Sequence, residues 1–230
     1  MLNMIKLDWL AMKCYRNRFV IIPLTIVAYG LLHEAVIILF MVFLVNSFSA
    51  NPFAVEEKGK LDHLYLTLPV TRRDIVNARY GLALIMQAVG LVLGTAVTLI
   101  YSALLYGRTV LYVFPHNFKA DFVTMFLLIS ACLLFYAIMN LSTFPLLFKV
   151  GYAKGKMPGF IIPIVAVSAI GGALVSLWHV NAAFQDWGLS MLAWAFAHTA
   201  AAAAILLGAA VALFAISYLL SRRFYEKREF

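Results

Sequence analysis

The largest polar segment of the chain begins at Asn51 and holds the side chains best suited to a binding function. Asn51 is a good helix N-cap, and Pro52 suits the first helical position. The carboxylates of Glu56 and Glu57 then lie close to the positive end of that helix. Apolar side chains recur at helical spacing before a proline ends the pattern: Leu61, Leu64, Tyr65, Leu68 and then Pro69. The segment therefore predicts an amphipathic helix with an exposed charged face.

A second helix is expected directly after this proline. Thr71 caps it, with Asp74 three residues later in a capping-box arrangement, and the helix should continue into a long apolar stretch. A plain connection between two helices needs only a handful of residues. Because residues 51–79 carry two caps and an apolar stripe, they favour a docking surface for another protein. The alternative is a loop that merely joins its neighbours.

Patterns typical of catalysis or nucleotide binding are incomplete in this chain. Residues 151–157 come near the P-loop pattern, but the glycine spacing is one residue short and Met157 has no hydroxyl for magnesium. Ser190 and His198 are about 12 Å apart along one helix, too far for a hydrogen bond without a break. The other histidines show no paired metal spacing. We therefore expect no catalytic residue, no metal site and no cofactor bound by this chain.

Several uncharged polar residues lie inside long apolar stretches, where a polar group should face protein or a cavity. They are candidates for a substrate path: Gln87, Asn140, Ser168 and Ser176. None of them is ionisable, which argues against a proton-coupled pump, and only Glu34 and His198 are loose candidates for a proton relay. Gly90 and Gly94 form a G-x-x-x-G pattern that permits close helix packing, within one chain or across a dimer.

The composition indicates that the elements carrying these residues lie in a membrane. Hydrophobic residues make up 64% and charged residues 12% of the 230 residues, whereas a soluble domain carries about 25% charged residues. Repeated long apolar runs favour helices, each crossing taking about 20 residues, over a barrel. The net charge of +8 does not indicate nucleic-acid binding, because the basic residues cluster between apolar runs. Cys14 and Cys132 form no metal or redox spacing.

The N-terminal fifth of the chain predicts a surface helix followed by a short hairpin. Residues 1–18 place apolar and basic side chains on opposite sides of a helix, which is typical of an amphipathic helix at a membrane surface. The alternative is an unstructured basic leader. Residues 19–50 are too long for one ordinary crossing and have basic flanks on both sides, so they predict two short crossings that turn near residue 33. The alternative is a signal peptide cleaved near residues 28–30.

Residues 80–220 predict the third to sixth crossings, and residues 221–230 form a basic tail. The stretch 180–199 is ambiguous, because its tryptophans and polar residues also suit an outer interfacial or re-entrant helix that leads into the last crossing. The four crossings are expected at residues 81–106, 122–148, 158–179 and 190–220.

The distribution of basic residues predicts the orientation. Sixteen of the 18 lysines and arginines lie in segments that alternate crossings place on one side, and only Arg108 and Lys119 lie on the other. Because basic loops stay in the cytoplasm, both chain ends and residues 51–79 should be cytoplasmic. The expected fold is a single all-α integral membrane domain, residues 1–230, with six crossings.

The polar segment also carries a specific order of short motifs. An acidic pair is followed by a leucine-proline step, a basic pair and an arginine-tyrosine step: Glu56-Glu57, Leu68-Pro69, Arg72-Arg73 and Arg79-Tyr80. This order resembles the first cytoplasmic loop of small ABC-2 type permeases, and more narrowly that of the permeases of phenol-soluble-modulin exporters. The six-crossing layout extends the resemblance over nearly the whole chain.

The resemblance implies a permease subunit of an exporter in the bacterial cytoplasmic membrane. Such a permease works with a second copy or a related permease, and with a separate ATPase subunit that binds ATP and magnesium. A coupling helix in the first cytoplasmic loop sits in a groove of the ATPase and transmits its closure. The implied substrate is an amphipathic or hydrophobic peptide, such as a phenol-soluble-modulin-like toxin or an antimicrobial peptide. The residues that match the coupling motif are Glu56, Glu57, Leu61, Tyr65, Pro69, Arg72, Arg73 and Asp74.

Two other functions stay open. An ion-coupled secondary transporter requires ligands for the coupling ion within the membrane, and the sequence offers no convincing set. A non-transporting membrane immunity or scaffold protein requires no ATPase at all.

Overall fold

The computed structural model of the protein describes residues 10, 38, 48–59, 71–105 and 122–227. The regular structure within these ranges is entirely α-helical, in agreement with the expected all-α fold. The helices are α4 (Asn51–Gly59), α6 (Arg72–Leu105), α7 (Phe122–Val150), α8 (Tyr152–Val180), α9 (Ala182–Ala197) and α10 (Thr199–Glu226).

Several sequence predictions fall outside the described residues. They are the surface helix 1–18, almost all of the hairpin 19–50, the second half of the coupling segment and the outer loop 106–121. Among the described helices, four are long and apolar enough to cross a membrane: α6, α7, α8 and α10. These four agree with the expected third to sixth crossings, whereas the total of six crossings and the orientation stay predictions.

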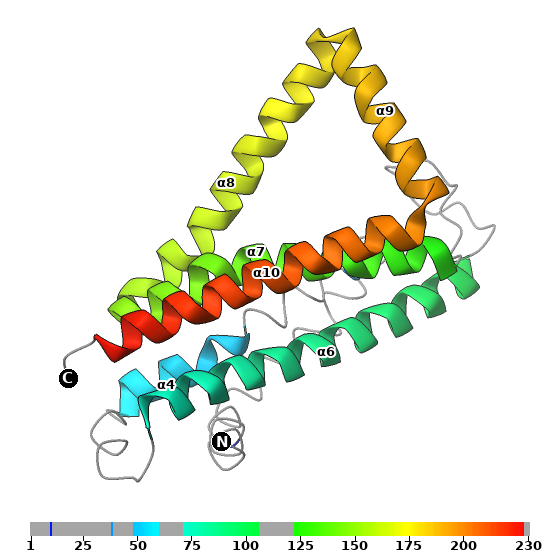
Figure 1. The fold of residues 1–230 in the computed structure, drawn as a ribbon. Coiled ribbons are helices and arrows are strands. Elements are labelled where there is room, and N and C mark those ends of the chain that lie inside the picture. Colours follow the sequence, from blue (N-terminus) through cyan, green and yellow to red (C-terminus); the bar gives the residue numbers. More distant parts are fainter. Residues whose placement is uncertain (1–9, 11–37, 39–47, 60–70, 106–121, 228–230) are drawn as a thin grey trace.

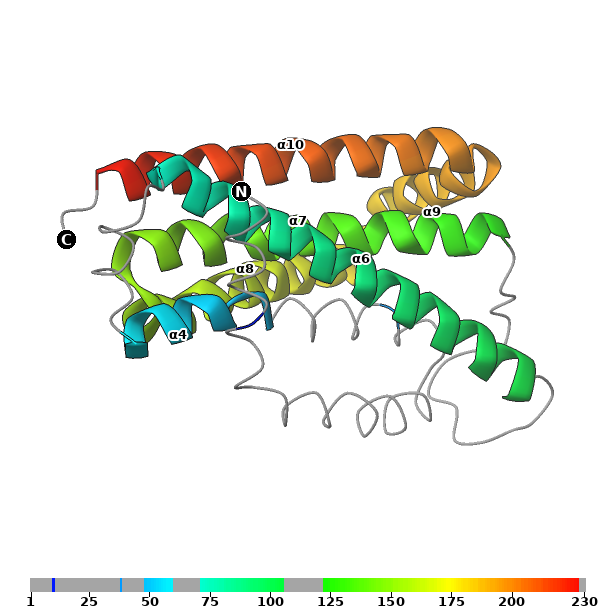
Figure 2. The same ribbon diagram turned by 90° about the horizontal axis from the view of Figure 1, so that it is seen from below.

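Three long helices lie side by side and create the frame of the protein (Figures 1 and 2). α7 and α10 run in the same direction and are the most closely associated pair, while α6 runs in the opposite direction. The first turns of α6 consequently lie at the same end of the molecule as the last turns of α7 and α10. The short helix α4 lies at that end too, which places most of the expected coupling motif there.

The start of α6 confirms the predicted capping box. The Thr71 backbone N–H donates to Asp74 Oδ2 at 3.3 Å, and the Asp74 backbone N–H donates to Thr71 Oγ1 at 3.2 Å. Each side chain satisfies a group that the first helical turn leaves without an intrahelical partner. From this cap the helix continues without a break to Leu105, so it also confirms the predicted run into the third crossing.

A single glycine separates α7 from α8. Gly151 has φ 84°, a conformation that L side chains rarely adopt, and it reverses the chain within one residue. α8 consequently begins at Tyr152, earlier than the expected crossing at 158–179, and Pro158 lies within its early turns. A Cβ on Gly155 would lie 3.0 Å from the Leu146 carbonyl oxygen, so this glycine allows the two helices to approach backbone to backbone.

Hydroxyl groups of α7 repair a gap in the hydrogen bonding of α8. Pro163 lies inside α8 and has no N–H, so the carbonyl of Gly159, four residues earlier, loses its helical donor. The Ser142 and Thr143 hydroxyls each donate to this carbonyl oxygen at 3.0 Å. Neighbouring hydroxyls are one of the ways in which a membrane helix tolerates an internal proline.

Beyond this contact α8 diverges from α7, and α9 returns the chain to the start of α10 (Figure 1). The prediction of a sixth crossing from 190 is wrong, because the helix breaks at His198 and α10 begins at Thr199. The 16 residues of α9 are fewer than the roughly 20 that a crossing takes. The ambiguous stretch 180–199 is thus largely a separate short helix, as one of its two interpretations expected.

Candidate functional site

The short helix α4 is packed against the protein through an aromatic anchor. Its first residue is Asn51, and Phe53 and Ala54 in the same first turn are buried, while the expected capping role of Asn51 stays a prediction. The Phe53 ring meets the rings of Phe144 and Phe148 of α7 edge-on, with centroids 5.8 and 4.9 Å apart. Edge-on aromatic pairs add to the gain from burying apolar area. The apolar face of α4 is therefore directed at the helix frame.

A buried ion pair joins α4 to α6. Arg79 Nη2 donates to Glu56 Oε2 at 2.7 Å, and the two side chains are only 1% and 8% exposed. The guanidinium also lies over the Phe53 ring, 4.6 Å from its centroid. The expectation that the acidic pair lies together on an exposed charged face is therefore wrong for Glu56. Its carboxylate turns inward because burying Arg79 without a counter-charge is costly.

The second carboxylate of the pair joins α4 to α8. Glu57 is exposed, as expected, and its Oε2 accepts a hydrogen bond from the backbone N–H of Ala153 at 2.9 Å. Ala153 lies in the first turn of α8, where the backbone N–H groups have no helical partner and the helix dipole favours an anion. The two adjacent glutamates thus attach α4 to two different helices, Glu56 to α6 and Glu57 to α8.

The basic pair at the start of α6 holds the end of α10. Arg72 Nη1 donates to the backbone carbonyls of Tyr225 and Glu226 at 3.3 and 2.8 Å, near the helix terminus where carbonyls lack intrahelical donors. Arg73 Nε pairs with Glu226 Oε1 at 3.1 Å, and Arg222 Nε reaches the same oxygen. The carbonyl contacts give this junction its geometry, because the ion pairs are solvent-exposed and weak.

Tyr80 connects α6 with both α7 and α10 just inside this end. Its hydroxyl is hydrogen-bonded to Ser217 and Ser221 at 2.7 and 2.8 Å, and Ser217 in turn donates to the Asn140 carbonyl at 2.8 Å. The Tyr80 ring also contacts the Phe144 ring, with centroids 4.9 Å apart. All these groups are buried, so the hydroxyls are satisfied by one another rather than by solvent.

Together these contacts define a junction, which we call the helix-end junction. It consists of α4, the first turns of α6 and α8, and the last turns of α7 and α10, centred on the side chains Phe53, Glu56, Glu57, Arg72, Arg73, Arg79 and Tyr80. Nothing in this set is arranged for covalent chemistry. The junction is suited to mechanical work, because a displacement of α4 is passed directly to three long helices.

The structure brings together only part of the predicted coupling set. Glu56, Glu57, Arg72, Arg73 and Asp74 all lie at the helix-end junction. The other members of the set, Leu61, Tyr65 and Pro69, lie outside the described residues. Their roles as contacts for another protein stay predictions.

Sequence reasoning missed Arg79 and Tyr80 as site residues. Both had been recognised in the motif, yet neither was given a role. A signal was present: Arg79 follows Ile75 and Val76 on the helix face that proves to be buried, where a lone cation calls for a buried partner.

The residues proposed for a substrate path do not converge. Gln87 and Asn140 are buried in the frame, whereas Ser168 and Ser176 are exposed on the diverging part of α8. The hydroxyl of Ser176 donates to the Gly172 carbonyl of its own helix. A path shared by all four residues would have to be completed by something other than the described part of this chain. Gly90 and Gly94 are buried on the same face of α6 as Gln87.

Ser190 and His198, the remaining candidates for a catalytic pair, do not contact each other. Ser190 donates to the Trp187 carbonyl and the His198 ring lies against the Trp194 carbonyl, so each contacts its own segment rather than the other. Among the described residues, no three His, Cys, Asp or Glu side chains are grouped to hold a metal ion.

The model of a family described as "ABC-2 family transporter protein" matches residues 3–226, which is nearly the whole chain. No curated protein and no solved structure matches the chain.

Proposed function

Because the chain belongs to the ABC-2 family of transporter proteins, we propose that it is the permease subunit of an exporter driven by a separate ATPase. The family and the long apolar helices make it a multi-pass membrane protein and a component of an ABC transporter. The direction of transport, the identity of the partners and the cargo are the parts that we add.

The observation that carries the coupling role is the attachment of α4. Phe53 is packed on α7, Glu56 is paired with Arg79 of α6, and Glu57 accepts from the first turn of α8. An ATPase that held the coupling segment would therefore move several transmembrane helices at once. It drives transport only if it binds the two arrangements of the permease with different affinity. ATP and magnesium are bound by that ATPase subunit.

We assign the junction to the cytoplasmic side of a bacterial plasma membrane. Lys58, Arg72, Lys154 and Arg223 all lie at this end of the helices, and basic residues are retained on the cytoplasmic side. Asp186 lies in α9, away from these ends of the frame.

A second permease, either a copy of this chain or a related one, completes the transporter in our proposal. Much of α8 and all of α9 expose large apolar side chains, among them Ile170, Val175 and Phe196. Lipid covers part of such a surface. A neighbouring permease that faced α8 would also give Ser168 and Ser176 a protein environment, which polar groups at membrane depth require.

The cargo that we propose is an amphipathic or hydrophobic peptide. The support is the scarcity of fixed charges along the membrane helices, which suits an apolar cargo better than a charged one. The family match is broader than the phenol-soluble-modulin exporters, so it does not narrow the cargo to those toxins.

The test is transport by the purified complex in vesicles. The chain is purified from its own host with any ATPase subunit that associates, reconstituted, and supplied with a fluorescent amphipathic helical peptide under either ATP or a proton gradient. Transport that requires both ATP and the ATPase supports the proposal. Transport under a proton gradient without ATPase contradicts it in favour of a secondary transporter. Failure of any ATPase to associate contradicts it in favour of a scaffold or immunity protein.

A further inference from the structure

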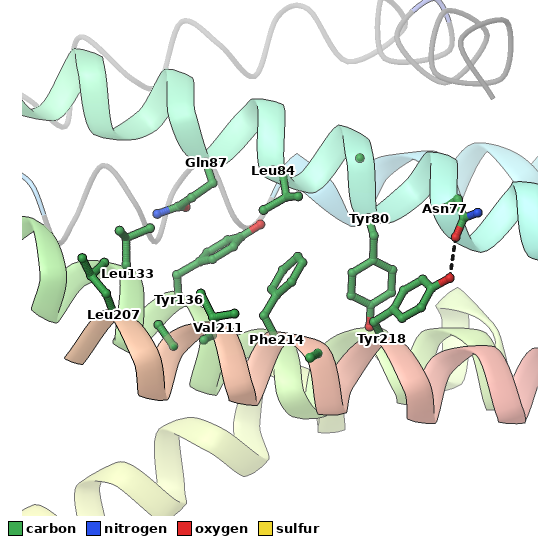
Figure 3. A pocket seen from close by; sticks show the side chains of 14 residues that line it. Asn77, Tyr80, Leu84, Gln87, Leu133, Tyr136, Leu207, Val211, Phe214 and Tyr218 are labelled. Carbon is green, nitrogen blue, oxygen red and sulfur yellow. Dashed lines mark hydrogen bonds between the residues drawn. The ribbon is translucent and has the colours of Figure 1, made fainter. Parts of the chain in front are cut away.

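A cavity of about 640 Å³ lies between α6, α7 and α10, deeper in the frame than the helix-end junction. Figure 3 shows its side chains converging from these three helices. Its volume is within the range of roughly 300–1,000 Å³ that is typical of sites for a single small molecule. The cavity therefore has room for a ligand, and its walls indicate which kind.

The walls of the cavity are apolar and uncharged. Leu133, Leu207 and Phe214 are typical of the lining, and among the described residues no lysine, arginine, aspartate, glutamate or histidine belongs to it. Burying an ion in such a place would cost several kcal/mol without a counter-charge, so an ionised ligand is disfavoured. A neutral, lipid-soluble molecule fits these walls.

The tyrosine hydroxyls of the lining are already engaged. Tyr80 is bonded to two serines, Tyr136 donates to the Ala83 carbonyl at 2.9 Å, and Tyr218 donates to Asn77 Oδ1 at 2.6 Å. These hydroxyls stabilise the walls of the cavity. Because their hydrogen bonds are already made, they do not need a ligand as a partner.

Gln87 is different, because its amide has no hydrogen-bond partner within the part of the chain that the structure describes. The residue is 2% exposed, and both its Oε1 and its Nε2 are buried without a hydrogen bond. Figure 3 shows it projecting from α6 into the space that Leu133 and Tyr136 of α7 also line. A buried amide left unsatisfied is destabilising, most of all where no water is at hand. A rotation of the Gln87 side chain toward the cavity would offer one acceptor and two donor hydrogens to whatever enters.

The rim of the cavity is open on the outer surface of the helices. Leu84 and Val211 belong to the lining, yet they are 51% and 69% exposed. Since α6 and α10 are membrane-length helices, this surface faces apolar surroundings, and a ligand can enter from there without passing through water.

We propose that this cavity binds one neutral, lipid-soluble small molecule whose primary amide pairs with Gln87. Once the Gln87 side chain has turned toward the cavity, an N–H of the ligand amide donates to Oε1 while its carbonyl accepts from Nε2, so one group satisfies both ends of the side chain. A trans secondary amide cannot do this, because its N–H and its carbonyl point to opposite sides. The apolar remainder fills the space between Leu133, Phe214 and Val211. The site belongs to this chain by itself and does not depend on coupling to an ATPase.

The test uses the full chain in phosphatidylcholine nanodiscs and two matched probes. 4-Hexylbenzamide carries a primary amide on an apolar body, whereas 1-hexyl-4-isopropylbenzene keeps the shape without the amide. Binding is measured by saturation-transfer NMR titration. We expect the amide to bind at least tenfold more tightly than the hydrocarbon. In Gln87→Leu this difference should disappear, and retained binding of the hydrocarbon would show that the cavity is intact.

A second variant locates the site independently of Gln87. Leu84→Trp enlarges an exposed rim side chain and should weaken the binding of both probes at least tenfold. Val175→Trp makes the same kind of change at an exposed position of α8 outside the cavity, and it should leave both probes unaffected. Equal affinity of the two probes for the unaltered chain would overturn amide recognition. Failure of both probes to bind would show that lipid occupies the cavity and would overturn the site itself.

Discussion

At the scale of single residues, the buried Arg79–Glu56 pair is the most consequential feature of the protein. Its two side chains are almost inaccessible, so neither is available as a surface contact. An acidic pair that reads as one motif in the sequence is divided by the structure: Glu56 positions α4 from inside, and Glu57 remains at the surface.

Removing one side chain of this pair should lower the free energy of unfolding far more than removing both. Arg79→Met leaves the Glu56 carboxylate buried without its cation, and we expect a loss of about 3–5 kcal/mol in the free energy of unfolding. The double variant Arg79→Met with Glu56→Met should recover most of that loss, because an apolar pair replaces the ion pair. Unfolding of the purified protein in detergent measures both.

Arg223→Met serves as the control, since Arg223 is exposed on α10 and should change the free energy of unfolding by less than about 0.5 kcal/mol. Equal stability of the single and double variants would show that the pair does not hold α4 in place.

At the scale of elements, α8 is packed on α7 over its first half, whereas its second half diverges from the frame and contacts α9 near its end. Gly155 and Gly159 bring the two backbones together, whereas a Cβ on Gly171 or Gly172 would meet nothing within 4 Å. The same helix is thus a fixed part of the frame at one end and a free apolar surface at the other.

Gly155→Val should separate α8 from α7. The new side chain begins 3.0 Å from the Leu146 carbonyl, a backbone atom that cannot move aside cheaply, so we expect a loss of about 1–3 kcal/mol. Gly208→Val is the matched control, since its Cβ would meet no atom within 4 Å. Equal melting temperatures for the two variants would contradict the close approach.

The hydrogen bonds to the Gly159 carbonyl lead to a second prediction for α8. Ser142→Ala combined with Thr143→Val removes both donors and should destabilise the protein by about 1–3 kcal/mol. Adding Pro163→Ala restores a helical N–H to the same carbonyl and should recover part of the loss. If the third substitution gives no recovery in the unfolding free energy, the hydroxyls do not compensate for the proline.

At the scale of the whole molecule, the helix-end junction makes one end of the protein a single mechanical unit. α4 is fastened to α6, α7 and α8, and the start of α6 is fastened to the end of α10. The far ends of α8 and α9 lack such connections within the described residues. A displacement of α4 would therefore disturb contacts that involve every long helix described here.

Glu57, the exposed member of the acidic pair, should affect transport more than it affects the stability of the fold. We expect Glu57→Ala to lower ATP-dependent transport at least tenfold, because α8 loses its tie to α4. The same variant should lose only about 0.5–2 kcal/mol of unfolding free energy, as is usual when a helix cap is removed. Asp186→Ala removes the same charge from α9 and should leave transport unchanged. Equal effects of the two variants on transport would show that the junction does not take part in coupling.

The orientation of the whole molecule can be measured by labelling intact cells. In a background with both native cysteines replaced, a membrane-impermeant maleimide should modify Asp186→Cys and leave Lys154→Cys unmodified. The reason is that Lys154 lies at the basic end of the helices and Asp186 at the other. The reverse labelling pattern would invert the topology and would remove the ATPase docking site from the cytoplasm.

The amino-acid sequence by itself determined the class of the protein and most of its long helices. Apolar runs of membrane length, the Thr71–Asp74 capping box and the sorted basic residues are local or compositional signals, and they do not depend on which helix packs against which. The starts of α8 and α10 were placed wrongly, because a glycine turn at 151 and a break at His198 are decided by packing and φ rather than by hydropathy.

Only the tertiary structure decided what the charged motif does. Glu56 and Glu57 are identical in type and adjacent in the chain, yet one is buried against Arg79 and the other caps α8. The sequence spacing cannot distinguish them, because the partners come from helices that are distant along the chain. The same holds for Gln87 and Ser168, two polar residues in apolar helices, of which one lines a cavity and the other faces outward.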